Sequence, residues 1–343
     1  MQDIDGLLKE LSVKRVDHLP IAAAFCRRIG LMDMVNRSVP TEMEVDIGTV
    51  VQAMVLDTLT GRSPLYRLEE FVESVDAELL LGKDLPARSF NDTTLGRALD
   101  AVYDVGTEPL FSQIAFRAAS LFPLDMRHVH FDTTSVNVWG AYDVYGEGDE
   151  EDERLRIVNG HSKDKRPDLK QFLIKMLCVQ RNVPLLGGCE NGNASDKTLN
   201  NDLLKRLSSY MAIHGMEPGA FIYIADSALV TPNNLKEVGD NLFITRLPFT
   251  YNEADRVVAE AVREDKWIDV GSLVQTPPRG HPKPAVYRVC EKTVTIGEVA
   301  YRAVVVHSSA HDKRRLKRIE RQLEKSRQEA EECLKDLYSP PLQ

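Results

Sequence analysis

The sequence predicts an α/β protein, in which a mixed sheet with flanking helices follows a helical N-terminal domain and precedes a β-rich insertion and a long C-terminal helix. Three observations predict this order. Apolar residues recur at three- and four-residue spacing up to residue 122, short apolar runs typical of strands follow, and a seven-residue repeat begins after residue 308. We therefore expect four parts, at residues 1–122, 123–249, 250–308 and 309–343.

The first part reads as helices in series. Helical periodicity covers residues 21–35, 47–59 and 95–105, and prolines and glycines separate these segments. Asn91 and Thr107 are expected N-caps, because Asn and Thr side chains accept hydrogen bonds from free amides at a helix start. Residues 1–122 are therefore a helical domain and a candidate for binding DNA ends.

The second part alternates strands and helices. Strand-like runs are expected at residues 128–132, 169–179, 183–188, 221–225 and 241–245, with helices from Asp196 to about Ile213 and from Pro232. The acidic stretch 145–153 is expected to be a solvated loop. Three strands joined by short turns, then strands reached through helices, predict a mixed sheet.

The third and fourth parts differ from each other in pattern. Residues 285–290, 292–296 and 301–307 read as further strands of the insertion. Residues 309–337 read as one long helix that is too polar for a core and resembles an arm. Its apolar residues lie at seven-residue spacing or beside it: Leu316, Ile319, Leu323, Ala330, Cys333 and Leu337.

Composition narrows the class of protein. The chain is 43% hydrophobic with no apolar run of membrane-spanning length and no secretory signal pattern, so the cytoplasm is the expected compartment. Five scattered cysteines without Cys-x-x-Cys spacing are expected to be reduced and to bind no zinc. The net charge is −9, but Lys313–Arg327 holds eight basic and two acidic residues, which fits either a phosphate contact or a solvated helix face.

Two aspartates each follow a strand-like run. Asp132 is expected to end the first strand and Asp226 to end the strand at residues 221–225. Open α/β sheets bind ligands at the carboxyl ends of their strands, and paired carboxylates are ligands that Mg²⁺ prefers. The alternative is that each aspartate caps a turn through backbone amides.

Four ordered stretches carry a resemblance to a known family. They are His130-Phe-Asp-Thr-Thr-Ser135, Gly160-His-Ser-Lys-Asp-Lys-Arg-Pro-Asp-Leu-Lys-Gln171, Asn191-Gly-Asn-Ala-Ser-Asp196 and Ile224-Ala-Asp-Ser-Ala-Leu229. With them the chain resembles bacterial insertion-sequence transposases of the DDE type, and within these the group with a helical N-terminal domain of uncharacterised role and a β-rich insertion. The resemblance runs from about Val13 to Lys335.

The resemblance implies an RNase H-like catalytic fold, Mg²⁺ or Mn²⁺ as cofactor, and cleavage and strand transfer of DNA at the inverted-repeat ends of an insertion sequence. Asp132 and Asp226 match the first two catalytic acids and metal ligands. The third, a glutamate framed by Tyr and Arg, has no match. The helix from Ser309 lacks that frame although it holds Glu320, Glu324, Glu329, Glu331 and Glu332. We therefore expect a transposase truncated or frameshifted before the third acid, with little activity alone.

Further residues lie in the shared stretches. Lys163, Lys165 and Arg166 are candidates for contacting DNA phosphate, against ordinary surface charge. Asn193 and Asp196 are candidates for lining the cleft, although helix capping explains Asp196 equally well.

Two other functions remain open. A truncated transposase without catalysis could bind element ends, inhibit full-length partners, or form a homodimer. A remoter alternative comes from His128-Val-His-Phe-Asp132, which resembles the opening motif of zinc metallo-β-lactamase-like hydrolases. Its three side chains would share one strand face, and imidazoles favour Zn²⁺. Thr133 stands where that motif has a further His.

Overall fold

The computed structural model describes residue 14, residues 16–142 and 155–213, residue 217, and residues 219–274 and 284–338. The expected acidic loop at residues 145–153 lies outside this set. The chain divides into two compact units, residues 1–245 and residues 246–343. The first unit contains a helical region and a five-stranded sheet, and the second contains a three-stranded sheet and a long helix.

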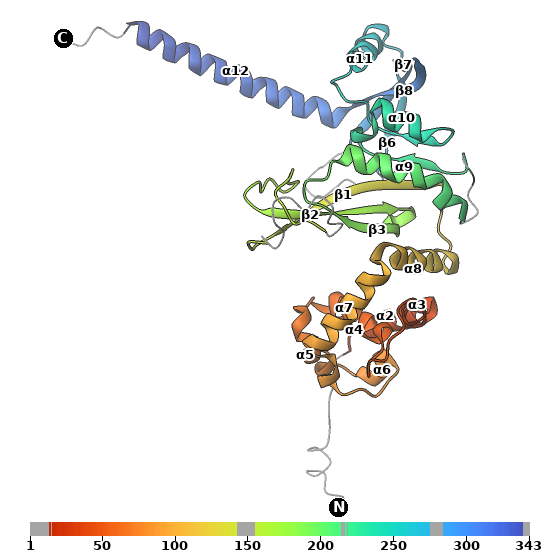
Figure 1. Ribbon diagram of the computed structural model, residues 1–343. Helices are drawn as coiled ribbons and strands as arrows, with labels where there is room; N and C mark the ends of the chain where they lie inside the picture. Colours follow the sequence, from red (N-terminus) through yellow and green to blue (C-terminus); the bar gives the residue numbers. More distant parts are fainter. Residues whose placement is uncertain are drawn as a thin grey trace, which may run out of the picture. The chain divides into compact units, whose positions relative to one another are not determined.

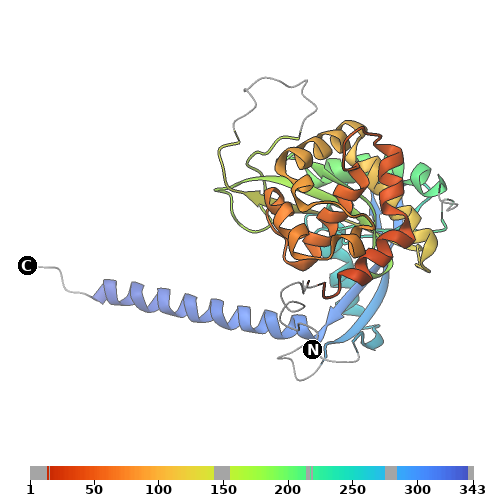
Figure 2. The same cartoon turned by 90° about the horizontal axis from the view of Figure 1, so that it is seen from below.

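The helical region, coloured red to orange in Figure 2, packs around one apolar core. Its longer helices are α2 (Leu19–Ile29), α3 (Leu31–Ser38), α4 (Ile47–Thr60), α7 (Asp92–Val105) and α8 (Thr107–Leu121). Shorter helical segments lie between them: η1 (Leu65–Arg67), α5 (Leu68–Ser74), α6 (Ala77–Leu81) and η2 (Ala87–Phe90). Helix α4 crosses the centre, because Ile47, Val50, Ala53 and Leu56 are fully buried.

The sheet of the first unit has the order β3-β2-β1-β4-β5. Its strands are β1 (His128–Val138), β2 (Lys170–Cys178), β3 (Pro184–Glu190), β4 (Ile222–Ile224) and β5 (Leu242–Ile244). The pairs β1–β2 and β2–β3 are antiparallel, whereas β1–β4 and β4–β5 are parallel. The expected mixed sheet is confirmed, and its order and directions agree with an RNase H-like arrangement.

Helices complete this layer. Helix α9 (Asp196–Ile213) lies against the sheet in Figure 1, and its Leu199, Leu203 and Leu204 share a core with Val129 and Tyr223. A short turn η4 (Ser227–Leu229) and helix α10 (Pro232–Val238) connect β4 to β5. An ion pair also joins α8 to the sheet, since Lys175 Nζ on β2 lies 3.0 Å from Glu108 Oε2.

The second unit has its own small core. Strands β6 (Ile268–Ser272), β7 (Val286–Ile296) and β8 (Val299–Ser308) form an antiparallel sheet. Helix α11 (Asn252–Glu264) buries Val257 and Ala261 against Cys290, Val294 and Val305 of that sheet. Helix α12 (Ser309–Tyr338) then runs as one uninterrupted helix in both views (Figure 1 and Figure 2).

Four sequence expectations need correction. Strand β1 does not end at Asp132 but continues to Val138, because β2 pairs with it through Lys170. Thr107 is the first residue of α8, and Gly106 holds the N-cap position. The strand runs expected at 285–290 and 292–296 form the single strand β7, and helix α11 was not expected.

Several other expectations hold. Asn91 caps α7 by accepting a hydrogen bond from the Thr94 amide at 3.0 Å, as expected. The long helix predicted after residue 308 is confirmed as α12. In the described residues, no helix combines the length and the apolar character that crossing a bilayer requires.

Candidate metal and nucleic-acid site

Asp132 lies on the solvent-facing side of β1. Residues alternate along this strand, with Val129, Phe131, Thr133 and Ser135 buried and Asp132 exposed between them. The Asp132 side chain is 82% exposed. Its Oδ1 accepts hydrogen bonds from the Thr133 amide at 2.8 Å and from Lys163 Nζ at 3.2 Å. Among the described residues, nothing donates to its Oδ2, which leaves one oxygen open to solvent.

Asp226 lies at the matching position on the neighbouring strand. In the parallel β1–β4 pair, His130 is the partner of Ile224, so Asp132 and Asp226 each lie two residues beyond the last paired position. Asp226 is exposed, caps η4 by accepting a hydrogen bond from the Ala228 amide at 2.9 Å, and bonds through its carbonyl to Thr245 Oγ1 at 2.6 Å. The two aspartates therefore follow equivalent positions at the carboxyl end of the paired β1–β4 segment.

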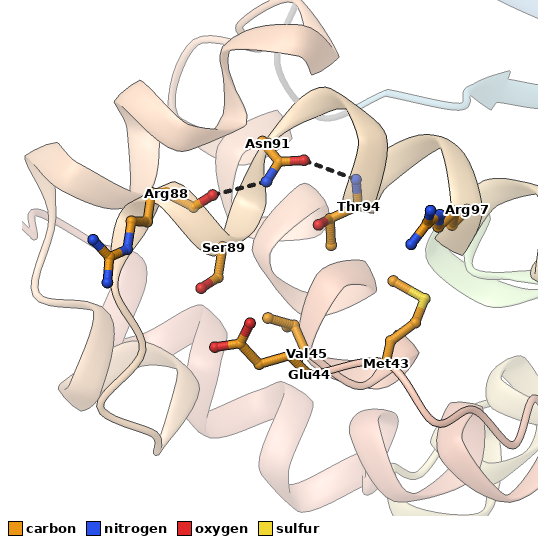
Figure 3. Close-up of a pocket in the computed structure, with 8 residues that line it drawn as sticks. All are labelled: Met43, Glu44, Val45, Arg88, Ser89, Asn91, Thr94 and Arg97. Atoms are coloured by element: carbon orange, nitrogen blue, oxygen red, sulfur yellow. Dashed lines mark hydrogen bonds between the residues drawn. The ribbon is translucent and has the colours of Figure 1, made fainter.

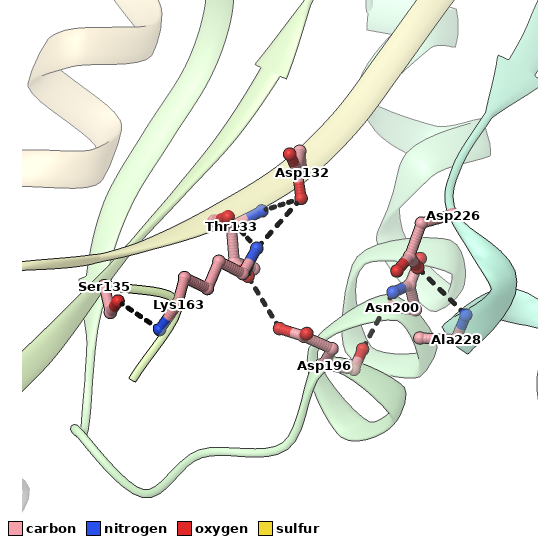
Figure 4. Close-up of polar contacts among 8 residues, drawn as sticks. All are labelled: Asp132, Thr133, Ser135, Lys163, Asp196, Asn200, Asp226 and Ala228. Atoms are coloured by element: carbon pink, nitrogen blue, oxygen red, sulfur yellow. Dashed lines mark hydrogen bonds and ion pairs between the residues drawn. The ribbon is translucent and has the colours of Figure 1, made fainter. Parts of the chain in front are cut away.

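Lys163 is held against Asp132 by the loop that precedes β2. Its backbone amide donates to Ser135 Oγ at 3.0 Å, and Ser162 Oγ donates to Asn137 Oδ1 at 3.1 Å. The ammonium group reaches Asp132 Oδ1, the Thr133 carbonyl and, at 3.1 Å, Thr133 Oγ1 (Figure 4). A positive charge is thus fixed beside the first acid.

The other basic candidates differ in their contacts. Arg166 forms a bidentate pair with Asp168, with N···O distances of 2.8 and 2.6 Å, and its guanidinium lies over the Trp139 ring. Lys165 is exposed at φ 59°, its backbone amide donates to the Ser162 carbonyl at 3.2 Å, and none of the described residues forms a hydrogen bond or ion pair with its side chain. Lys165 is therefore the basic side chain of this loop most available to an external phosphate.

Asp196 lies beside the site and not at a distance from it. It is the first residue of α9, and its Oδ1 accepts a hydrogen bond from Thr133 Oγ1 at 2.6 Å. Asn193 is exposed three residues before α9, and no contact of its side chain joins it to the aspartates within the described residues. Of the two cleft candidates, Asp196 alone is linked to β1 by a described hydrogen bond.

A buried polar chain behind the aspartates escaped sequence reasoning. Tyr223 Oη donates to Asn200 Oδ1 at 2.9 Å, and Asn200 Nδ2 donates to the Asp196 carbonyl at 2.8 Å. Burial, and then the negative charge of Asp226, raise the pKa of the Tyr223 hydroxyl, which therefore stays a neutral donor. Together with the hydrogen bond from Thr133 to Asp196, this chain ties α9 to β1 and β4, the two strands nearest the acids. The burial of Thr133 and Asn200 is visible only in the structure, so the sequence gives no signal for this chain.

Two of the four stretches that carry the family resemblance, residues 160–171 and 191–196, lie side by side at the N-terminal end of β2. Gln171 is buried, pairs with Val158 through an isolated bridge, and donates from Nε2 to the Gly192 carbonyl at 2.7 Å. The Arg156 amide donates to Asn191 Oδ1 at 2.8 Å. These contacts hold the Lys163 loop and the segment before α9 together.

The carboxylate oxygens of Asp132 and Asp226 suit a hard cation, but two carboxylates are a small set of ligands. Two exposed carboxylates, one within β1 and one just after β4, match the oxygen ligands that Mg²⁺ prefers. Each is engaged locally, Asp132 with Lys163 and Asp226 with the Ala228 amide, so a cation that binds Asp132 Oδ1 would displace Lys163 (Figure 4). In the described part of the chain, no three His, Cys, Asp or Glu side chains are grouped as a metal site. His128 and His130 share the exposed face of β1 with Asp132 but form no such group.

A separate pocket lies in the helical region (Figure 3). It has a volume of about 330 Å³ and is lined by Met43, Glu44, Val45, Arg88, Ser89, Asn91, Thr94 and Arg97. Glu44, Arg88 and Arg97 are exposed, and within the described residues none of them forms an ion pair. The pocket therefore presents charges of both signs, and the sequence did not predict it.

Comparison with known proteins gives one match. A family model described as a domain of unknown function (DUF4277) matches residues 11–116. No curated protein and no solved structure matches the chain. The matched segment covers the helical region and the pocket of Figure 3 and ends before β1.

Proposed function

We propose that this chain is a DNA transposase of the DDE type, which binds the inverted-repeat ends of an insertion sequence and cleaves and joins DNA with Mg²⁺ or Mn²⁺. The observation that carries the proposal is that Asp132 and Asp226 each lie two residues beyond the last paired residues of the parallel strands β1 and β4. The matched domain of unknown function lies where the resembled group has a helical domain of uncharacterised role. A DNA substrate implies the cytoplasm as the working compartment.

Each residue of the site has a role in this proposal. Asp132 and Asp226 hold the cation, which when bound activates a hydroxyl for attack on the phosphodiester. Lys165 contacts a DNA phosphate, and Arg166 and Lys163 add positive charge next to the scissile position. Asp196 and Asn193 line the cleft. Asp196 also positions β1 through its hydrogen bond with Thr133.

A second function is favoured by one specific observation. No third acidic ligand joins Asp132 and Asp226 in the part of the chain that the structure describes. Two carboxylates leave the metal ions and the attacking group poorly fixed, and precise positioning accounts for much of the rate of such reactions. We therefore propose that the chain alone binds DNA ends more readily than it transfers strands, so that an inhibitory or DNA-binding role is the alternative.

DNA binding and cleavage measured on the same samples separate these functions. The full chain is mixed with the inverted repeats that flank its coding sequence, with Mn²⁺, and followed by gel shift and by strand cleavage. Binding that weakens with rising salt and exceeds binding to a scrambled duplex supports either function. Slow cleavage that disappears in Asp132→Asn and Asp226→Asn, but persists in the exposed control Asp240→Asn, supports the transposase. An absence of binding at low salt contradicts both functions.

A further inference from the structure

Helix α12 is a long surface that its own chain leaves uncovered. It spans 30 residues, and every residue from 315 to 331 is exposed. Leu316 is 59% exposed, Ile319 is 43% exposed and Leu323 is 66% exposed. Isolated helices gain most of their stability from packing an apolar face against another element. We therefore expect another element to pack against the exposed leucines of this helix.

The spacing of the apolar residues specifies what kind of occupant fits. Leu316, Ile319 and Leu323 alternate by three and four residues, and the same spacing continues in the sequence through Ser326, Ala330, Cys333 and Leu337. This 3.5-residue average repeat is the pattern of a two-stranded coiled coil, with these residues at its a and d positions. A globular core would demand a wider apolar stripe. The occupant is therefore another helix with the same repeat.

We infer that α12 pairs antiparallel with α12 of a second copy of this chain, with the two helices overlapping over their length. In that arrangement each a position of one helix faces a d position of the other. The facing pairs are Leu316 with Cys333, Ile319 with Ala330, and Leu323 with Ser326. Leu316, Ile319 and Leu323 thus each meet a smaller residue, which is the condition for side chains of facing layers to interdigitate, and Leu337 lies opposite Asp312 at the end of the overlap.

The charged residues beside the seam favour the same register. In full antiparallel overlap Glu320 of each copy faces Arg327 of the other, so two opposite-charge pairs form, and Gln322 faces Glu329. A shift by one seven-residue repeat in either direction brings Glu320 against Glu320 or Arg327 against Arg327. Like charges therefore disfavour the neighbouring registers.

Parallel pairing is less favourable on the same sequence. It sets Arg315 against Glu320 but leaves Arg327 opposite the uncharged Gln322. It also places Ser326 on Ser326 and Ala330 on Ala330, so that small residues face small ones and large residues face large ones, which packs less closely than large against small. The a and d positions hold few leucines, whichever way the helices run, so the dimer is expected to dissociate on dilution. The inference is independent of the proposed metal site, since no residue of that site lies in α12.

Sedimentation equilibrium of the full chain tests the inference. We expect a mass that rises with concentration toward twice 38.6 kDa. Leu323→Lys places charge in the seam and should give a monomer. Gln328→Lys makes the same change in charge on the outer face of the helix and should leave the dimer intact. Because Leu323 is 66% exposed, its replacement does not disturb the core of the monomer. A wild-type monomer throughout, or a Leu323→Lys dimer, overturns the proposal.

Charge reversal then tests the orientation. Glu320→Lys sets like charges against Arg327 in the antiparallel pair and should weaken the dimer about tenfold, since two exposed pairs are lost. Adding Arg327→Glu makes the reversed charges attract and should restore most of the affinity. In a parallel pair the second substitution faces Gln322 and restores nothing. Circular dichroism checks that α12 stays helical in both variants. A double variant that dimerises as weakly as Glu320→Lys overturns the antiparallel arrangement.

Discussion

Lys163 Nζ lies 3.2 Å from Asp132 Oδ1, so an ammonium group already engages one of the two oxygens with which Asp132 would bind the proposed cation. The pair is open to solvent, with the Lys163 side chain 38% exposed and that of Asp132 82% exposed. An exposed ion pair contributes about 1 kcal/mol or less. Lys163 therefore competes with a cation without excluding it, and neutralises the acid in the absence of metal.

Replacing Lys163 should strengthen the binding of a metal ion to Asp132. We expect Lys163→Met to bind Mn²⁺ more tightly than the wild type, by at most about fivefold, since the exposed pair that is lost is worth about 1 kcal/mol or less. Calorimetric titration with Mn²⁺ measures the change. Lys165→Met is the matched control, because Lys165 has no ion pair among the described residues. Weaker Mn²⁺ binding in Lys163→Met would contradict competition.

Two glycines in the helical region should respond oppositely to the same substitution. A Cβ on Gly48 would lie 2.4 Å from the Met32 carbonyl oxygen, where α3 and α4 cross, whereas a Cβ on Gly96 would meet nothing within 4 Å. Gly48→Ala should lower the free energy of unfolding by about 1–3 kcal/mol through overpacking. Gly96→Ala, in the exposed interior of α7, should raise it by about 0.5–1 kcal/mol. Urea unfolding followed by circular dichroism measures both, and equal effects would show that the helices do not cross at Gly48.

The stability of the helical region should depend on pH through Asp46. Burial raises its pKa, but hydrogen bonds from Lys83, Asn36 and Thr49 outweigh burial and lower the pKa from the ordinary 3.8 to about 2. Because the folded pKa lies below the unfolded one, the stabilisation is complete above pH 3.8 and is lost as the pH falls toward 2.

The isosteric variant Asp46→Asn tests this linkage. It should unfold at a lower temperature than the wild type at pH 6, because it loses the charge that faces Lys83. The difference should shrink steadily between pH 4 and pH 2, as the wild-type carboxyl takes up its proton. Melting curves at each pH provide the measurement, and a difference that does not vary with pH would refute the role of the charge.

Lys175 joins three elements of the first unit. Its ammonium pairs with Glu190 on β3 at 2.6 Å and with Glu108 on α8 at 3.0 Å, and its side chain is only 14% exposed. Burial alone would lower the pKa of Lys175, but the two glutamates raise it, so the group stays charged. Lys175→Met leaves two carboxylates close together and should lower the free energy of unfolding by about 2 kcal/mol, below the loss seen for fully buried pairs.

A second-site change separates charge from packing at this position. Adding Glu108→Gln to Lys175→Met removes one of the two carboxylate charges that Lys175 no longer neutralises. It should restore part of the lost stability in urea unfolding. If the double variant is less stable than Lys175→Met alone, the loss reflects packing of the lysine stem and not the ion pair.

Much of the first unit could be predicted from its pattern. The alternation of apolar residues and the position of helix breakers gave α9 its full extent from Asp196 to Ile213, and placed β2, β4 and β5 within two residues. These elements are recognisable because each buries one continuous apolar face. The equivalent positions of Asp132 and Asp226 depend on the register of β1 and β4, which no local sequence pattern reveals.

The elements that escaped prediction depend on tertiary contacts. The polar run Thr133–Ser135 looks like a turn, but its ladder with β2 keeps it extended to Val138. The apolar residues of helix α11 are all alanines and valines, and the helix is stabilised by packing Val257 and Ala261 on the second sheet. The Lys163–Asp132 pair joins residues 31 positions apart through a loop whose course the sequence does not specify.

Anomalous X-ray scattering from crystals soaked in Mn²⁺ tests the central claim most directly. The account predicts one anomalous peak bonded to carboxylate oxygens of both Asp132 and Asp226, with Lys163 displaced from Asp132, and no such peak in Asp226→Asn crystals. A Mn²⁺ ion bound elsewhere, or bound to Asp132 while Asp226 keeps only the Ala228 amide, would contradict it.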